Sequence, residues 1–229
     1  KDVELFKKIK EGLAVSMEDR GGPEAALISS YPLNRQLVGM TISDVSEKRK
    51  EKPLDCALEL LREHTEAVLS GEVKGGFGIV NFNQSEENVE HIMKQPWVAF
   101  GTDGRVHKPS GVLSKHMPAP HPRFYGTFPR VLSRYVREKG ILTLEDAIRK
   151  MTSLPAQILG LNNRGTLQTG NYADITVFDF ERIIDKAEYA PPEATKQLPE
   201  GIHHVIVNGE LTIQAGKHTG VRAGKILTL

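Results

Sequence analysis

The spacing of hydrophobic positions changes along the chain and predicts two kinds of element. Val3, Phe6, Ile9 and Leu13 recur at helical spacing, which predicts an amphipathic helix over residues 2–20. Short continuous apolar runs are typical of strands buried on both faces. Such runs occupy residues 25–28 and 97–100, and residues 77–82 are strand-like. Further helices are predicted at about 41–50, 53–69, 127–139 and 144–152, with a short one after Ser85. Strands that alternate with helices favour a parallel sheet built from βα units.

The pattern is different after Leu161. Glycines punctuate short strand-like runs at 174–178, 203–208 and 211–214, and helical periodicity disappears. We therefore expect an all-β segment and a domain boundary near residue 160. Residues 105–122, with four prolines and one glycine, are expected to form an irregular loop.

Composition and charge exclude several classes of protein. The 229 residues include 30 basic and 29 acidic ones, so nothing favours a nucleic-acid or anionic-membrane partner. No apolar run is long enough to predict a transmembrane helix. Cys56 is the single cysteine, which rules out an internal disulfide and suits a cytoplasmic location. Its helical, leucine-rich context predicts a buried packing residue.

The first candidate for chemistry is Asp103. It follows the apolar run at 97–100 and precedes Gly104. The C-terminal rim of a βα barrel holds its catalytic groups in such places. An Asp-Gly pair after a strand is also a common turn, so this spacing alone leaves both interpretations open.

Several further segments share one resemblance. They are Thr102–Gly104, the run HPRFYGTFPRVL at 121–132, MTSLPA at 151–156, GNYADITVFD at 170–179 and VIVNG at 205–209. Together they resemble the C-terminal part of the N-acyl-D-amino-acid deacylases of the amidohydrolase superfamily, over residues from about 20 to 229. The resemblance implies an α/β fold: the last βα units of a TIM-type (β/α)8 barrel, followed by strands of a small β-sandwich domain. The implied domains are 1–160, with an insertion at about 32–82, and 161–229.

The resemblance also implies a chemistry, the zinc-dependent hydrolysis of the amide bond of a small-molecule N-acyl-D-amino acid. Asp103 matches the family's metal-site aspartate that takes a proton from the attacking water, a role that a carboxylate beside a cation can fill. Thr102 stands where the family usually has serine. Arg123 matches an arginine that binds the substrate carboxylate, which suits its paired donors. A structural ion pair is the alternative for Arg123.

Other candidates are less specific. Ser29 and Tyr31 follow a predicted strand and would line the substrate pocket, although a plain strand-end turn explains them equally well. Gln84 aligns with a pocket-lining position of the family. The loop histidines His107, His116 and His121 lack the spacing of metal ligands on a regular element, so we interpret them as surface or loop residues, with His121 a candidate to orient the Arg123 loop.

The metal site implied by the resemblance is incomplete in this sequence. It contains no His-X-His motif, and its one cysteine has the wrong context, so the remaining zinc ligands are expected upstream in a longer protein. The Lys at position 1 fits that expectation. The isolated chain is then expected to lack amidase activity and tight zinc binding, and to bury exposed apolar faces by self-association. Two alternatives remain: a dihydroorotase- or hydantoinase-like amidohydrolase, and a non-catalytic module of the same fold.

Overall fold

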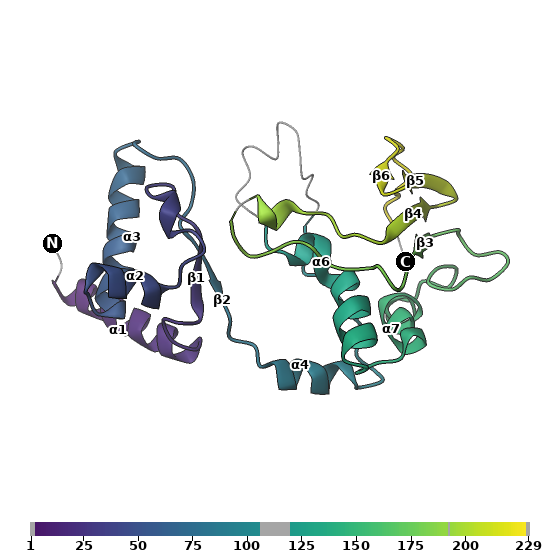
Figure 1. Cartoon of the computed structure of the whole chain (residues 1–229), viewed down its shortest axis with the longest axis horizontal. Coiled ribbons are helices and arrows are strands. Elements are labelled where there is room, and N and C mark those ends of the chain that lie inside the picture. Colours follow the sequence, from purple (N-terminus) through teal and green to yellow (C-terminus); the bar gives the residue numbers. More distant parts are fainter. Residues whose placement is uncertain (1–2, 106–119, 192, 228–229) are drawn as a thin grey trace. The chain divides into compact units, whose positions relative to one another are not determined.

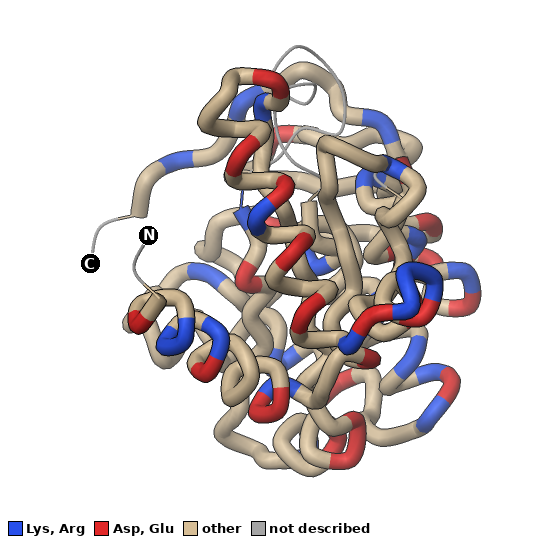
Figure 2. Tube along the Cα trace, turned by 90° about the vertical axis from the view of Figure 1, so that its left-hand side faces the viewer, with Lys and Arg blue, Asp and Glu red and all other residues tan. Residues whose placement is uncertain are grey.

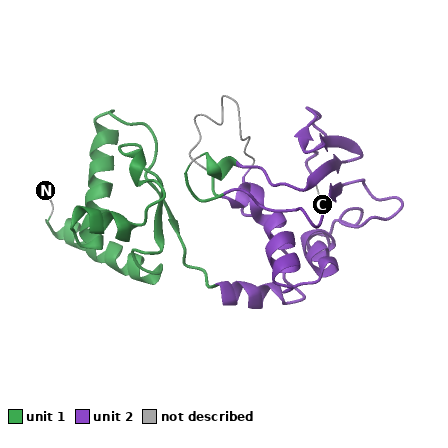
Figure 3. Ribbon diagram, in the orientation of Figure 1, with its two compact units in different colours: residues 1–85, 110–121, 188–196 green, residues 86–109, 122–187, 197–229 purple. Residues whose placement is uncertain are grey.

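A computed structural model describes residues 3–105, 120–191 and 193–227 (Figure 1). Acidic and basic residues are interspersed along the trace, in keeping with the near-zero net charge (Figure 2). The chain divides into two compact units (Figure 3). Unit 1 comprises residues 1–85, 110–121 and 188–196, and unit 2 comprises 86–109, 122–187 and 197–229. None of the described helices is long and apolar enough to cross a membrane.

Unit 1 combines helices with a two-stranded antiparallel sheet. Its elements are α1 (Val3–Asp19), β1 (Ala26–Ser30), η1 (Arg35–Leu37), α2 (Ile42–Arg49), α3 (Pro53–Leu69), β2 (Gly78–Asn81) and η3 (Ala194–Lys196). Leu27 lies opposite Val80 in the β1–β2 pair, and a bulge interrupts the register between Ile28 and Ser30.

The core of unit 1 forms between β1 and the helices α2 and α3. Ile28, Cys56 and Leu60 are fully buried in it, and Val45 is 1% exposed. Local signals start both helices. Thr41 and Asp44 form a reciprocal capping box at α2, and α3 begins at Pro53, whose missing N–H needs no partner in a first turn.

Unit 2 packs a helical layer with a four-stranded sheet. Its elements are α4 (Glu86–Met93), α6 (Arg123–Arg130), η2 (Val131–Glu138), α7 (Leu144–Met151), α8 (Ser153–Ile158), β3 (Ile175–Phe178), β4 (Ile202–Val207), β5 (Glu210–Gln214) and β6 (Lys217–His218). The sheet is an antiparallel meander in the order β3-β4-β5-β6. Asn208 and Gly209 make its β4–β5 turn with positive φ angles, as a tight two-residue hairpin requires.

The helix α6 continues directly into η2, a π-helical segment. Pro129 lies inside α6 and has no N–H to donate, and the wider π-helical turn begins two residues later. The continuous helix buries Leu132 and Tyr135 in a core that also holds Ala147 and Ile183. Arg123, at its first turn, thus lies on a helix that is anchored in the core of unit 2.

The predicted parallel sheet is not formed by the described residues, whose strand pairs are all antiparallel. Residues 97–100, predicted as a buried strand, form no strand. A buried parallel strand needs hydrogen-bonded neighbours, and within the described ranges no strand pairs with this segment. Its Phe100 N–H instead donates to the Lys150 carbonyl at 3.0 Å.

The two units do not divide at the predicted boundary near residue 160. Phe178, Phe180 and Ile202 pack against the same core as Leu132 and Ala147, so the C-terminal strands belong to one unit with the preceding helices. The strands β3–β6 lie in the C-terminal segment, which also contains η3. The domain limits 1–160 and 161–229, and the insertion at 32–82, stay predictions. The loop predicted at 105–122 falls mostly on residues 106–119, outside the described residues.

Candidate active site

The loop Thr102–Gly104 presents Asp103 at the surface of unit 2. Asp103 has a left-handed backbone with φ of 48°, which Asp tolerates better than most residues. The Gly104 N–H donates to Thr102 Oγ1 at 3.1 Å and closes a local turn. A Cβ on Gly104 would lie 3.3 Å from the Phe124 Cα, so the loop passes close to the first turn of α6. The Asp103 side chain is 86% exposed.

Arg123 reaches Asp103 from the first position of α6. Its Nη1 donates to Asp103 Oδ2 at 2.6 Å, a short charge-assisted contact. These two residues are 20 positions apart in the sequence, and both were predicted as site residues. The structure brings them together within one unit, which makes this pair the centre of the candidate site.

The helix that carries Arg123 is also tied to Asp185. Arg130 Nη1 donates to Asp185 Oδ2 at 3.0 Å. A Cβ on Gly126 would lie 3.0 Å from the Asp185 Cβ, so glycine permits this close approach. The Thr127 hydroxyl also donates to the Arg123 carbonyl at 3.0 Å. The helix that carries Arg123 therefore has contacts in unit 2 besides those with the Asp103 loop.

The described residues do not form a metal centre. Among them, no group of three or more His, Cys, Asp or Glu side chains is close enough to hold a metal ion. Asp103 offers a single carboxylate, which Arg123 contacts. His121 packs edge-on against the Tyr189 ring, with centroids 5.1 Å apart, and His107 and His116 lie outside the described residues.

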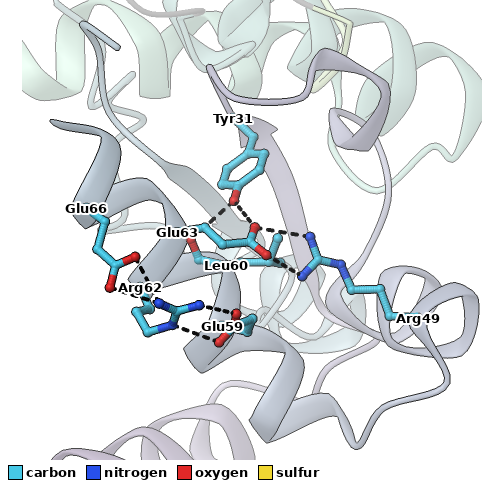
Figure 4. A network of polar contacts seen from close by, with 7 residues as sticks. All are labelled: Tyr31, Arg49, Glu59, Leu60, Arg62, Glu63 and Glu66. Carbon is cyan, nitrogen blue, oxygen red and sulfur yellow. Dashed lines mark hydrogen bonds and ion pairs between the residues drawn. The ribbon is translucent and has the colours of Figure 1, made fainter. Parts of the chain in front are cut away.

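Tyr31 is a buried member of a partly exposed polar network of unit 1 (Figure 4). It is 2% exposed, and its hydroxyl contacts Glu63 Oε2 at 2.8 Å and the Leu60 carbonyl at 3.3 Å. Arg49 pairs with both oxygens of Glu63, at 3.0 and 3.1 Å. Burial, and then Glu63, raise the pKa of Tyr31, and Arg49 lowers the pKa of Glu63. These contacts hold the Tyr31 side chain within unit 1, and its pocket-lining role stays a prediction.

Ser29 and Gln84 also belong to unit 1. Ser29 lies in β1 beside the bulge, half-buried, and its Oγ is 2.8 Å from the place where a Cβ on Gly78 would stand. Gln84 is exposed on the segment between β2 and α4. Both belong to a different compact unit from Asp103 and Arg123, and their pocket-lining role stays a prediction. Cys56 is fully buried as predicted, and burial raises the pKa of its thiol.

Sequence reasoning missed Arg149 and Lys150 at the end of α7. Lys150 is fully buried, and both side chains contact the segment that leads to Asp103. The available signal was helical spacing, because Lys150 lies three residues after the buried Ala147 and therefore on the buried face of α7. A lysine at such a position is unusual enough to mark it for inspection.

Comparison with known proteins shows the family to which this chain belongs. A model of the amidohydrolase family matches residues 81–213, more than half of the chain and a range that includes both Asp103 and Arg123. The chain therefore belongs to the amidohydrolase family. Among its relatives, the D-aminoacylase of Alcaligenes xylosoxydans xylosoxydans is 39% identical over 150 residues, which are 66% of this chain and 28% of that protein. The chain thus spans little more than a quarter of this relative.

Solved structures give the same result. A D-aminoacylase structure, from work on its binuclear metal centre, matches with 32% identity and a TM-score of 0.68, over 89% of this chain and 38% of that one. An N-acyl-D-glutamate deacylase from Bordetella bronchiseptica, complexed with zinc and a phosphonate inhibitor, matches with 29% identity and a TM-score of 0.64, over 85% and 36%. These neighbours have the amidohydrolase TIM-barrel fold, which confirms the predicted α/β fold class and the resemblance to the deacylases.

Dihydroorotases, the alternative enzyme class, match shorter stretches. That of Endomicrobium trichonymphae is 41% identical over 98 residues, 38% of this chain. The deacylase matches extend further along the chain at similar identity.

Proposed function

We propose that this chain is the C-terminal portion of a zinc-dependent N-acyl-D-amino-acid deacylase. The reaction would hydrolyse the amide to a carboxylate and a free D-amino acid. The observation that carries the proposal is the 2.6 Å contact between Arg123 and Asp103, two residues that the deacylase resemblance assigns to one site. The relatives named D-aminoacylase and N-acyl-D-glutamate deacylase support the substrate class.

The two side chains have complementary tasks in this proposal. Arg123 binds the α-carboxylate of the substrate through its planar donors. Because Nη1 of Arg123 already contacts Asp103, a carboxylate bound to the same guanidinium lies close to the Asp103 side chain. Asp103 accepts a proton from water as the water oxygen bonds to the acyl carbon. It then passes that proton to the amide nitrogen as the C–N bond breaks.

Zinc is part of the proposal for the whole protein, as it is present in the matched Bordetella deacylase structure. The described residues supply one carboxylate toward it, Asp103, and we propose that the other ligands lie in a longer chain. A small-molecule substrate, a cytoplasmic location and self-association of the isolated chain complete the proposal.

The deciding experiment replaces Asp103 in the protein that contains this chain. Asp103→Asn keeps the shape of the side chain and removes its basicity. We expect kcat for an N-acetyl-D-amino acid to fall by about 10²- to 10⁴-fold, the usual contribution of a general base, with the melting temperature unchanged. Asp55→Asn is the matched control, because Asp55 also lies 2.6 Å from a cationic side chain, that of Lys10, and is partly exposed. Full activity in Asp103→Asn would exclude this role.

A further inference from the structure

The last turn of α7 holds the segment that precedes Asp103 at four points. Lys150 Nζ donates to the Met93 carbonyl at 2.7 Å and also to the Gln95 carbonyl. Arg149 Nη2 donates to the Pro96 carbonyl at 2.7 Å. In the reverse direction, the Phe100 N–H donates to the Lys150 carbonyl at 3.0 Å. Two adjacent residues therefore bind the chain at four positions between 93 and 100.

Burial of the Lys150 ammonium group carries a desolvation cost. Its side chain has no exposed surface, and burial lowers the pKa of the ammonium group, an effect that Asp146, at 3.8 Å, partly opposes. A buried ammonium is tolerated only when its donors are satisfied. The carbonyls of Met93 and Gln95 satisfy two of them, and the Met93 carbonyl belongs to the C-terminal end of α4, where a cation is favoured.

Beyond the contacts with α7, Met93 is buried in the core of unit 2 and Phe100 packs against that core. Residues 97–100 form no strand within the described ranges, so no ladder of backbone hydrogen bonds fixes them. The Lys150 ammonium also lies 6.0 Å from the centre of the Phe100 ring. Phe100 is three residues before Asp103. The backbone contact of Phe100 with the end of α7 therefore lies just before the chain enters the Thr102–Gly104 loop.

We propose that Lys150, assisted by Arg149, is a positioning residue that fixes residues 93–100 and thereby holds the Asp103 carboxylate at Arg123. This role for Lys150 in catalysis rests on the proposed function, in which Asp103 is the base. Arg123 lies on α6, which Arg130 ties to Asp185, so we expect release of the segment to move Asp103 more than Arg123. The expected consequence is a loss in kcat with little change in KM.

The test compares three variants. Lys150→Met removes the cation and keeps most of the volume, and Lys150→Arg keeps the cation. Arg137→Met is the matched control, because Arg137 also donates to two backbone carbonyls of unit 2, those of Phe180 and Ile183, at 2.7 and 2.8 Å, on a segment that does not lead to Asp103. Amide hydrogen exchange is measured on the 229-residue chain, and kcat and KM on the whole protein.

We expect Lys150→Met to speed exchange of the amides at 97–104 by about tenfold while β3–β6 keep their protection, and to lower kcat about tenfold with KM unchanged. Lys150→Arg should restore most of both values, and Arg137→Met should change neither. Wild-type exchange at 97–104 in Lys150→Met, or an equal rise throughout unit 2, would overturn the positioning role. If the wild-type protein hydrolyses no N-acyl-D-amino acid, the proposed function fails, and the exchange data still decide whether Lys150 fixes the segment.

Discussion

At the scale of single residues, carboxylates paired with cations organise both units. Glu63 joins Arg49 to Tyr31 in unit 1, and Asp103 meets Arg123 in unit 2. A third carboxylate, Glu86, accepts from Lys139 and Arg134 at the start of α4. Lys139 first, and then Arg134, hold the pKa of Glu86 at about 2, well below its ordinary value near 4.5.

The depressed pKa of Glu86 predicts a pH dependence of stability. The folded state binds this proton less readily than the unfolded state, so its contribution is full above pH 4.5 and is lost as the pH falls towards 2. Because Glu86 is 44% exposed, we expect Glu86→Gln to cost less than about 1 kcal/mol at pH 7. Urea unfolding at pH 7, 4.5 and 3 should show a weaker acid loss in Glu86→Gln than in wild type. Glu87→Gln, one position along α4, is the control, and parallel curves for wild type and Glu86→Gln would refute the assignment.

At the scale of elements, the sequence predicts what local signals determine. The helices appear where apolar spacing and first-turn residues place them, as with Pro53 at α3 and Thr143 at α7. The pairing of β1 with β2 and the absence of a strand at 97–100 depend on non-local partners, which periodicity does not specify. The helical spacing of α7 was enough to predict that Lys150 is buried. The sequence did not indicate which backbone carbonyls Lys150 binds.

The N-terminal cap of α7 gives a test at this scale. Thr143 Oγ1 accepts from the Asp146 N–H at 3.2 Å and satisfies a donor that the helix leaves open. We expect Thr143→Ala to lower the free energy of unfolding by about 1 kcal/mol, and Thr143→Ser to keep most of it. Chemical denaturation followed by circular dichroism measures both, and equal stability of the Ala and Ser variants would show that the cap does not contribute.

At the scale of the whole molecule, the chain leaves much apolar surface uncovered. No described residue of α1 is buried, and Val3, Phe6 and Val15 are 82%, 57% and 59% exposed. Asp103 and Arg123 were predictable as a pair because a family resemblance named both. Their 2.6 Å contact could come only from the three-dimensional structure. The same holds for the contacts of α7 with the segment before Asp103, and of Asp185 with the helix that carries Arg123.

The exposed face of α1 predicts that the isolated chain self-associates, because its net charge of +1 opposes association only weakly. Light scattering over a concentration series should give a mass that rises with concentration. Phe6→Glu should lower that rise, and Lys7→Glu, on the same helix, should affect it less. A monomer mass at every concentration would contradict the expectation.

The central claim, that this chain belongs to a deacylase of N-acyl-D-amino acids, is tested most directly by substrate choice. The measurement is kcat/KM of the zinc-loaded, full-length protein for an N-acetyl-D-amino acid, its L-enantiomer and the cyclic amide dihydroorotate, each also with Asp103→Asn. The account predicts hydrolysis of the D-enantiomer far above the other two, and its loss in Asp103→Asn. Preference for dihydroorotate, or turnover of the D-enantiomer that survives Asp103→Asn, would contradict it.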